Sequence, residues 1–300
     1  MNAVADWIAV DWGTSNLRAW AMAGGRPVAE AQADHGMGVL QPHQFEPALL
    51  DLLTPWLDTG LITVVACGMV GARQGWTEAP YTPVPCAPLS GRLKAPPATD
   101  PRLDVRIIPG LSQVRPPDVM RGEETQIAGY LASDPGFDGV LCLPGTHTKW
   151  AQISAGEVVS FRTFMTGEIF ALLAGQSVLR HFVGEGWDEA AFTEAASDAL
   201  SRPEALAARL FSLRAESLIA DLSPAAARAR LSGLLIGAEL AAARPYWLGQ
   251  RVALIGAPGL SETYGAALAA QGLLAETADA TRATLAGLAA AHANYTETAP

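Results

Sequence analysis

The sequence WIAVDWGTSNLRAW, residues 7–20, decides the fold prediction, because in it two apolar strands flank a short polar turn. The first strand ends at Asp11, and the small residues that follow are typical of a tight turn. A second strand is predicted over 17–22, and the pair Gly24-Gly25 then marks a hairpin into a third strand over 27–33. This part of the chain therefore predicts a meander of three strands with a carboxylate at its first turn.

The same order of elements returns around LCLPGTHTKW, residues 141–150. A strand leads into a hydroxyl-rich turn, and two further strands are predicted over 150–154 and 157–164. Each meander is followed by helix-compatible sequence and then by an apolar strand that runs into glycines, over 62–69 and 251–255. A repeat of topology without close identity predicts two similarly folded α/β lobes with a cleft between them.

We expect one domain to span residues 1–137 and the other residues 138–300. The first would hold the first turn and the substrate, and the second would hold the second turn and an adenosine site. An Ala-rich region over 188–243 is predicted to be helical, with breaks near Pro203 and Pro224. The proline-rich segment 80–101 is predicted to be an extended surface excursion.

Composition excludes several classes of partner. The 300 residues are half hydrophobic, which is enough for a substantial core. Twenty basic and thirty acidic residues give a net charge of −10, which repels nucleic acid and anionic lipid surfaces. No stretch reaches the roughly 18 apolar residues of a membrane span. We therefore expect small-molecule partners, with neither nucleic acid nor membrane, and leave a homodimer open.

The cysteines and the N-terminus predict a cytoplasmic protein. Cys67, Cys86 and Cys142 are an odd number at wide spacings, which is typical of reduced thiols and fits no metal-binding motif. Asp6 and Asp11 stand where a signal peptide would need basic residues followed by an apolar stretch. A cytosolic enzyme agrees with both observations.

The first turn has the composition of a phosphate-binding site. Backbone N–H groups and hydroxyls of Gly13, Thr14 and Ser15 can cradle phosphate oxygens. Asp11, at the end of the preceding strand, can hold Mg²⁺ directly or through water. An ordinary hairpin, with Asp and Gly present for turn geometry, is the alternative.

A second turn of the same kind stands at the matching place in the other half. Gly145 and Thr146 can bind the same polyphosphate, so that paired turns would grip ATP from two sides. His147 and Lys149 add donors that suit either the transferred phosphoryl group or a substrate carboxylate. In a plain hairpin, His147 would cap the turn and Lys149 would face solvent.

A glycine-rich turn after the strand over 251–255 is a candidate adenosine site. Gly256, Ala257 and Gly259 would let an adenine or ribose ring approach the backbone closely. A helix is predicted to start at Ser261, with that serine as its N-cap. Glycines at such a turn also occur for packing reasons alone.

Two adjacent glutamates are candidates for the chemistry itself. The segment RGEETQI, residues 121–127, is predicted to open a helix, and phosphoryl transfer needs a carboxylate that orients or deprotonates the attacking hydroxyl. Glu123 and Glu124 point about 100° apart on a helix, so only one is expected to face the cleft. Acidic residues also favour any first helical turn, whatever the function.

Arginines and an indole beside glycines are candidates for binding an acidic substrate. In GARQGW, residues 71–76, Arg73 offers a bidentate partner for a carboxylate, Gln74 an amide, and Trp76 a flat wall. Arg121 and Arg162 are further candidate cations. Structural salt bridges would explain these arginines equally well.

Taken together, the motifs resemble the 2-dehydro-3-deoxygalactonokinase family of the actin/hexokinase-like superfamily. The resemblance rests on DWGTSNLRAW, CGMVGARQGWTEAPY, PDVMRGEETQI, CLPGTHTKW and FMTGEIFALL, all within residues 11–173. It implies an α/β fold of two ribonuclease H-like lobes around a central cleft. It also implies transfer of the γ-phosphoryl group of ATP, with Mg²⁺, to the 6-hydroxyl of 2-dehydro-3-deoxy-D-galactonate in galactonate and galactose breakdown.

The second turn departs from the pattern of the superfamily, because Leu143 and Pro144 stand where the usual motif has an Asp. We therefore assign no catalytic base to this turn. Glu123 is the first candidate for the base, since its segment also resembles the helix that carries the catalytic Glu of exopolyphosphatases. Asp11 is the rival, and Asp11 and Glu124 are the expected metal ligands.

Three other functions compete with this prediction. A kinase for another sugar acid would use the same site, and a phosphoanhydride hydrolase would use Glu123 to activate water. A nucleotide-binding sensor would need an output module, and the sequence has neither a basic helix-turn-helix extension nor a heptad run. The set Arg73, His147 and Lys149 favours an acceptor with a carboxylate, so we predict a sugar-acid kinase.

Overall fold

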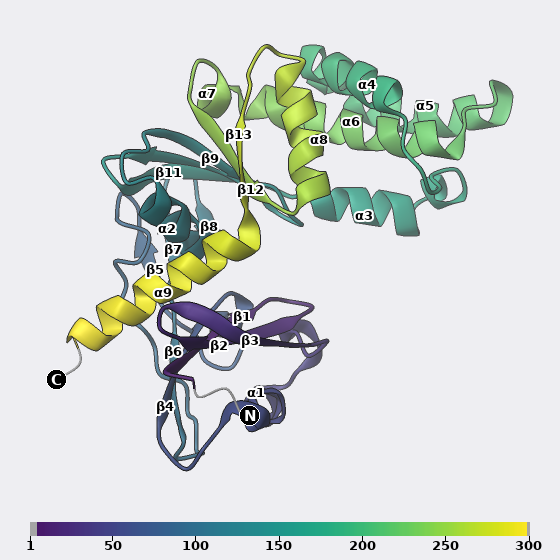
Figure 1. The fold of residues 1–300 in the computed structure, drawn as a ribbon. Coiled ribbons are helices and arrows are strands. Elements are labelled where there is room, and N and C mark those ends of the chain that lie inside the picture. The colour runs from purple at the N-terminus through teal and green to yellow at the C-terminus, as the bar shows by residue number, and fades with distance from the viewer. Residues whose placement is uncertain (1–4, 299–300) are drawn as a thin grey trace. The chain divides into compact units, whose positions relative to one another are not determined.

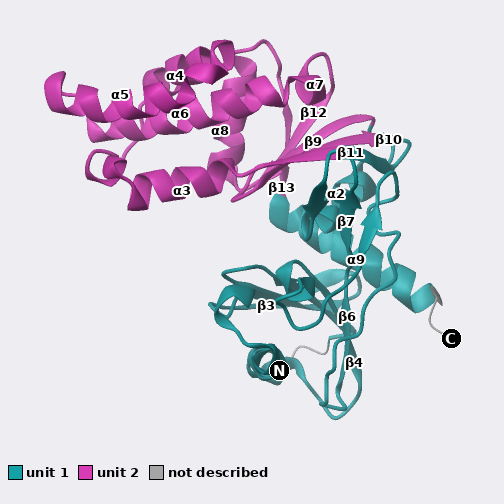
Figure 2. Cartoon of the chain, turned by 180° about the vertical axis from the view of Figure 1, so that it is seen from behind, with its two compact units in different colours: residues 1–137, 154–160, 280–300 teal, residues 138–153, 161–279 magenta. Residues whose placement is uncertain are grey.

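The computed structural model describes residues 5–298, which form two compact units (Figure 2). Unit 1 contains the chain up to residue 137, together with residues 154–160 and the chain from residue 280 onward. Unit 2 contains residues 138–153 and 161–279. The predicted boundary after residue 137 is the end of the first part of unit 1, and unit 1 also includes the two later segments.

The sheet of unit 1 is built on the predicted meander. Its strand order is β3-β2-β1-β4-β6, in which β1 pairs antiparallel with β2, β2 antiparallel with β3, β1 parallel with β4, and β4 parallel with β6. The strands are β1 (Trp7–Trp12), β2 (Leu17–Ala23), β3 (Arg26–Ala33), β4 (Ile62–Cys67) and β6 (Leu103–Ile107). The register sets Asp11 opposite Arg18 on one side and Cys67 on the other.

Helices cover both faces of this sheet because successive side chains of its strands point to opposite faces. Helix α1 (Phe45–Leu53) packs against Ile8 and Val10 on one face. Helix α9 (Ala280–Thr298), yellow in Figure 1, packs against Trp7 and Ala9 on the other. The apolar side of α9 thus completes the core of unit 1, although α9 is the last element of the chain.

Helix α2 (Glu123–Ser133) crosses α9 at close range. A Cβ atom at Gly129 would collide with the carbonyl oxygen of Ala283, and a Cβ atom at Gly287 would collide with that of Thr125. Glycine at both positions lets the two backbones touch. The crossing therefore fixes α2 relative to α9.

The proline-rich segment 80–101 has little regular structure, but it is not wholly a surface excursion, because Leu89 and Leu93 pack against a buried cluster of unit 1. It contains one short strand, β5 (Tyr81–Pro83), which joins β7 (Gly110–Gln113) and β8 (Asp118–Met120) in a sheet of order β5-β7-β8. Farther along this segment, Cys86 pairs with Val158 through two backbone hydrogen bonds of 2.9 and 3.2 Å.

Unit 2 repeats the sheet of unit 1. Its strand order is β11-β10-β9-β12-β13, in which β9 pairs antiparallel with β10 and parallel with β12, and β12 pairs parallel with β13. The strands are β9 (Gly139–Leu143), β10 (Thr148–Ser154), β11 (Glu157–Phe164), β12 (Val252–Gly256) and β13 (Glu276–Asp279). If the strands of each sheet are numbered in chain order, both sheets have the spatial order third, second, first, fourth, fifth. This duplication confirms the predicted α/β fold class.

The α-helices that the structure describes in unit 2 are α3 (Thr166–Gln176), α4 (Glu189–Ser201), α5 (Leu206–Ile219), α6 (Pro224–Ala242), α7 (Arg244–Trp247) and α8 (Pro258–Ala269). Of these, α4, α5 and α6 lie in the predicted Ala-rich region, and α3, α7 and α8 lie outside it. Breaks occur near Pro203 and Pro224, as predicted, and Ser223 caps α6 by accepting a hydrogen bond from the N–H of Ala226.

The predicted start of α8 at Ser261 is wrong. The helix begins at Pro258, with Ala257 as N-cap, and the N–H of Ser261 already donates to the carbonyl oxygen of Ala257 at 2.9 Å. Proline is favoured in the first turn because its fixed φ suits a helix and its missing N–H would have no intrahelical partner there. Ser261 is therefore inside the first turn and buried.

Among residues 5–298, no helix is long and apolar enough to cross a membrane.

Candidate active site

Asp11 stands at the end of β1, where its carboxylate has partners on both neighbouring strands. Arg18 Nη2 lies 2.5 Å from Asp11 Oδ2, and the thiol of Cys67 donates weakly to Asp11 Oδ1 at 3.9 Å. Arg18 Nη1 also donates to Thr281 Oγ1, in the first turn of α9, at 3.3 Å. The carboxylate is thus oriented by a guanidinium group, and 22% of the Asp11 side chain is still exposed.

The first turn is braced from behind by the segment 36–38. The N–H of Met37 donates to the carbonyl oxygen of Gly13 at 3.0 Å, and the N–H of Gly38 donates to that of Thr14 at 2.9 Å. A Cβ atom at Gly36 would collide with the turn. These bonds fix the turn while Thr14 and its neighbour Ser15 stay exposed, which suits a turn that binds phosphate.

Three segments meet at two glycines near Asp11. Gly68, just after β4, has φ +91°, and a Cβ atom there would lie 2.7 Å from the carbonyl oxygen of Trp12 and 3.5 Å from Asp11 Oδ1. Gly122, just before α2, has φ +105°, and a Cβ atom there would lie 3.4 Å from the Cα of Gly68. Only glycine readily adopts these φ values. The ends of β1 and β4 therefore meet the start of α2.

The two glutamates of α2 lie in different surroundings, as their helical spacing predicts. Glu124 is fully buried, and the N–H of Gly122 donates to Glu124 Oε1 at 2.9 Å and to Oε2 at 2.8 Å. Burial, reinforced by the charge of Glu123, raises the pKa of Glu124 to about 8. Glu123 is partly exposed, and its Oε2 accepts from the N–H of Arg121 at 3.0 Å. Glu123 is therefore the more accessible carboxylate.

The thiol of Cys67 lies near the carboxylates of both Asp11 and Glu124. This thiol is buried, and burial together with the negative charges of Asp11 and Glu124 raises the pKa of Cys67 well above its ordinary value. The helix that carries Glu124 and the strand that carries Asp11 thus face the same point in unit 1.

The candidate substrate loop after β4 is partly exposed and partly anchored in the core. Arg73 and Gln74 are exposed, and Arg73 Nε lies 3.5 Å from Glu78 Oε1. Trp76 is only 6% exposed, and its ring centroid lies 6.2 Å from that of Trp12. The indole therefore anchors the loop in the core. Its role as a flat wall for the substrate stays a prediction, and this burial does not support it.

Arg121 is buried beside the same loop. Its Nη2 donates to the carbonyl oxygen of Ala79 at 2.8 Å, and its guanidinium carbon lies 4.3 Å from the ring centroid of Tyr81. Its Nε and Nη1 have no hydrogen-bond partner within residues 5–298. Arg121 therefore holds the segment 79–81, and contact with a substrate stays a prediction.

The second turn in unit 2 is held by the start of α3. The N–H of Glu168 donates to the carbonyl oxygen of Thr146 at 3.0 Å, and a Cβ atom at Gly167 would collide with the carbonyl oxygen of Gly145. His147 Nε2 lies 2.5 Å from Glu168 Oε2. Lys149 is 5% exposed, and its Nζ donates to the carbonyl oxygen of His147 at 3.4 Å. The turn and the two predicted donors thus form one cluster with the start of α3.

A cavity of about 270 Å³ in unit 2 joins the second turn to the loop after β12. Gly145 lines it from the turn, Gly167 from α3, and Gly259 from α8. Next to it, Gly256 is buried and Ala257 is exposed. The structure therefore brings together the predicted phosphate turn and the predicted adenosine loop. Arg162 lies exposed on β11.

Glu239 is a site residue that the sequence analysis missed. It is buried in α6, and it accepts hydrogen bonds from Trp150 Nε1 at 2.8 Å, from the hydroxyl of Tyr264 at 2.8 Å, and from Thr166 Oγ1. Burial raises the pKa of Glu239 to about 7. Thr166 and Tyr264 also line the cavity, so Glu239 ties its walls together. A single Glu within the apolar run LLIGAEL was the available signal.

A family model described as 2-keto-3-deoxy-galactonokinase matches residues 11–291. The chain belongs to this family. A Rhizobium meliloti (strain 1021) protein named probable 2-dehydro-3-deoxygalactonokinase is 41% identical over 301 residues, covering 97% of this chain and 98% of its own length. The 2-dehydro-3-deoxygalactonokinase of Escherichia coli (strain K12) is 36% identical over 272 residues, covering 89% of this chain and 91% of its own.

A crystal structure from Sinorhizobium meliloti of a protein with the same assignment has the same fold. It is 40% identical to this chain, covers 98% of each chain, and superimposes with a TM-score of 0.90. The family resemblance read from the sequence is therefore confirmed. As a member of this family, the chain is a sugar-acid kinase, a phosphotransferase whose phosphate donor is ATP.

The residues near Asp11 can be compared with the needs of a kinase Mg²⁺, which takes one or two carboxylates and completes its shell with water and phosphate oxygens. Asp11 fits, because among the described residues Oδ1 has only a weak thiol donor, and because part of the side chain is exposed. Glu124 fits less well, because both its oxygens accept from Gly122 and no part of it is exposed. Its role as a metal ligand stays a prediction.

Proposed function

We propose that this chain transfers the γ-phosphoryl group of ATP to the 6-hydroxyl of 2-dehydro-3-deoxy-D-galactonate, giving ADP and the 6-phosphate. The family match over residues 11–291 carries the proposal. The meeting of Asp11 with the start of α2 supports it, since phosphoryl transfer needs a metal-binding carboxylate and a second carboxylate for the attacking hydroxyl.

Within this proposal, Glu123 is the general base and Asp11 holds Mg²⁺ directly or through water. Glu123 is the partly exposed glutamate of α2, so a substrate hydroxyl can approach its carboxylate. Bound Mg²⁺ would neutralise charge on the β- and γ-phosphates. Arg18 orients the Asp11 carboxylate through its 2.5 Å ion pair.

In unit 2, ATP is proposed to bind the second turn and the loop after β12, where Gly145 and Thr146 would hold phosphate oxygens. Gly13, Thr14 and Ser15 of the first turn are the proposed phosphate-binding residues of unit 1. Gly256, Ala257 and Gly259 would face the adenosine. The cavity that Gly145 and Gly259 share supports this assignment, because one nucleotide can reach both residues.

The carboxylate of the substrate is proposed to bind cationic side chains, for which each unit offers its own candidates. Arg73 and Gln74 are exposed at the loop, and His147 and Lys149 lie at the second turn. Arg121 and Arg162 are the further candidates. Guanidinium groups are preferred partners of carboxylates because they form two parallel hydrogen bonds.

We also infer a cytoplasmic protein whose partners are small molecules. The three cysteines are free thiols, which is the usual state in a reducing compartment, and the net charge of −10 disfavours nucleic acid. The homodimer that the sequence left open stays a prediction.

An ADP-release assay with Mg-ATP tests the proposal. The acceptors are 2-dehydro-3-deoxy-D-galactonate, its C4 epimer, and buffer alone. We expect fast turnover with the first, slower turnover with the epimer, and almost none with buffer. A rate with every acid no faster than with buffer would refute the kinase, and phosphate release without any acid would favour a phosphoanhydride hydrolase.

A further inference from the structure

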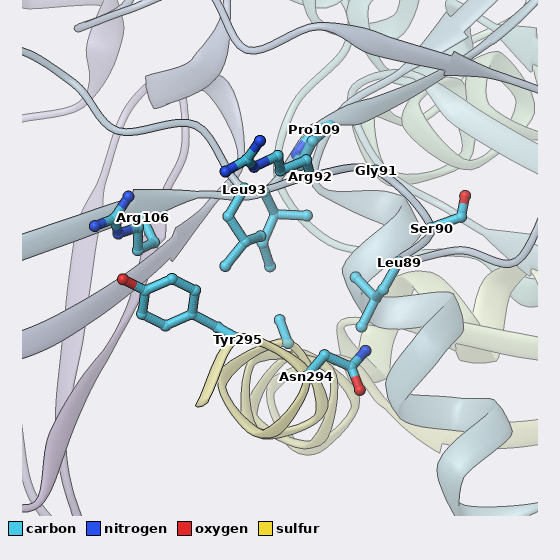
Figure 3. A pocket seen from close by; sticks show the side chains of 11 residues that line it. Leu89, Ser90, Gly91, Arg92, Leu93, Arg106, Pro109, Asn294 and Tyr295 are labelled. Carbon is cyan, nitrogen blue, oxygen red and sulfur yellow. The ribbon is translucent and has the colours of Figure 1, made fainter. Parts of the chain in front are cut away.

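Besides the cavity in unit 2, the structure has a cavity of about 600 Å³ in unit 1, which lies outside the candidate active site (Figure 3). Its walls come from the segment 89–93, from the end of β6 with Arg106, and from the second half of α9 with Asn294 and Tyr295. The candidate catalytic, nucleotide-binding and sugar-acid-binding residues do not line it. Its volume lies within the range of roughly 300 to 1,000 Å³ that is typical of small-molecule sites.

The floor of this cavity is apolar and firmly packed. Ile108 and Ala291 are buried in the cluster that joins α9 to the sheet, and Leu89 and Leu93 pack against that cluster. Figure 3 shows Leu89 and Leu93 on opposite sides of the open space. A floor fixed by the core of unit 1 is formed before any ligand arrives, which lowers the entropic cost of binding.

One side of the rim carries a guanidinium group that is held in place. Arg106 Nη2 lies 2.6 Å from Asp104 Oδ1, and the guanidinium carbon lies 4.8 Å from the ring centroid of Tyr295. The hydroxyl of Tyr295 donates to Asp104 Oδ2 at 2.9 Å. Arg106 Nε is buried and has no hydrogen-bond partner within residues 5–298. The guanidinium group is thus held in a fixed orientation by Asp104 and Tyr295.

The second cation of the rim is Arg92. It is exposed, lies above Leu93 in Figure 3, and forms no hydrogen bond or ion pair with any residue that the structure describes. Asp104 offsets one of the two guanidinium charges at the rim, which leaves one positive charge in a protein whose net charge is −10. An unpaired cation beside a hollow is a suitable partner for an anion.

We propose that this cavity binds a small organic anion, in which a carboxylate or phosphate joins an apolar or planar body. The anionic group would contact Arg92 and Arg106, and the body would lie on Leu89 and Leu93. A neutral apolar ligand would leave the cations unused, and an inorganic anion would leave the apolar floor uncovered. Both parts of the ligand are therefore needed for tight binding.

Isothermal titration calorimetry of the full chain with phenyl phosphate tests this proposal. A nonhydrolysable ATP analogue and the sugar acid are kept saturating, so that the kinase site is filled. We expect phenyl phosphate to bind more tightly than either inorganic phosphate or phenol. Benzoate in place of phenyl phosphate then distinguishes a carboxylate site from a phosphate site.

The variant Arg92→Ala should weaken the binding of phenyl phosphate about tenfold, the usual cost of losing a charged hydrogen bond. Lys94→Ala is the matched control, because it removes an exposed positive charge two residues away that does not line the cavity. The affinity of Lys94→Ala for phenyl phosphate should equal that of the parent chain. Equal affinity of the parent chain and Arg92→Ala, or no binding of any of the organic anions, would overturn the proposal.

Discussion

At the scale of single residues, the candidate active site separates two neighbouring carboxylates by their burial. Glu123 is partly exposed at the start of α2, whereas Glu124 is fully buried and bound to the N–H of Gly122. The same segment of sequence therefore gives one side chain access to a ligand and keeps the other inside.

The roles of Glu123 and Asp11 can be told apart by their kinetics. Glu123→Gln removes the proposed base, so kcat should fall by about 10² to 10⁴ with little change in the Mg²⁺ dependence. Asp11→Asn should instead raise the Mg²⁺ concentration that gives half-maximal rate. Both are measured by ADP release against Mg²⁺ concentration.

Asp58→Asn is the matched control for these two variants and should leave both quantities unchanged. Within residues 5–298, the side chain of Asp58 accepts only a local hydrogen bond, from the N–H of Thr59. If Asp11→Asn abolished kcat while the Mg²⁺ dependence stayed the same, Asp11 would be the base and the proposed roles would be reversed.

Glu239 should make the stability of unit 2 depend on pH. Its pKa is raised from 4.5 to about 7, so between these values the unfolded chain ionises Glu239 while the folded chain keeps it protonated. The contribution of this carboxyl to stability is therefore complete below about pH 4.5 and declines as pH rises to about 7.

Glu239→Gln removes this ionisation. Relative to the parent chain, its free energy of unfolding should rise by about 2 kcal/mol between pH 5 and pH 8. Urea denaturation followed by tryptophan fluorescence measures this, with Trp150 as a reporter bonded to Glu239. The exposed Glu194 in α4 provides the control Glu194→Gln. For this control, we expect the difference in free energy of unfolding from the parent chain to stay the same from pH 5 to pH 8. If the difference in free energy of unfolding between Glu239→Gln and the parent chain were also independent of pH, the prediction would be wrong.

At the scale of elements, the two candidate phosphate turns are supported by neighbouring segments that come very close. Gly36 and Gly38 lie behind the first turn, and Gly167 lies behind the second. The turn residues themselves were predictable, because Asp, Gly and Thr have known local preferences. The supporting glycines come from other segments, and their spacing in HGMG and MTGE carries no comparable local signal.

The support of the second turn can be tested with one methyl group. In Gly167→Ala, the Cβ atom would collide with the carbonyl oxygen of Gly145, so the turn must move, and we expect the KM for ATP to rise about tenfold. Gly175→Ala in the same helix is the control, because a Cβ atom there meets nothing within 4 Å. An unchanged KM in Gly167→Ala, measured by ADP release, would show that the turn does not position ATP.

At the scale of unit 1 as a whole, α9 connects the candidate active site to the cavity in unit 1. Near its start, Thr281 accepts from Arg18, which pairs with Asp11. In its middle, Gly287 touches α2 at Thr125, and near its end Asn294 lines the cavity. A ligand in the cavity adds contacts to a helix that also orients Asp11.

Occupancy of the cavity should therefore be coupled to catalysis. With saturating phenyl phosphate, we expect the KM for the sugar acid to fall about threefold, because the added contacts stabilise α9 where Thr281 holds Arg18. Arg92→Ala should abolish this effect, and Lys94→Ala should keep it. A KM that does not change while calorimetry shows the ligand bound would contradict the coupling through α9.

The sequence by itself determined the two strand meanders, the turns at Asp11 and Gly145, the helix that begins at Glu123, and the family. These features follow from hydrophobic periodicity, turn chemistry and continuous motifs, which act between residues close together in the chain.

Only the tertiary structure decided that α9 completes unit 1, that Trp76 anchors its loop in the core, that Glu239 ties the walls of one cavity together, and that Arg92 and Arg106 share another. Burial, close backbone approach and shared cavities arise when segments far apart in sequence pack together. No local pattern of residue types specifies which segments those will be.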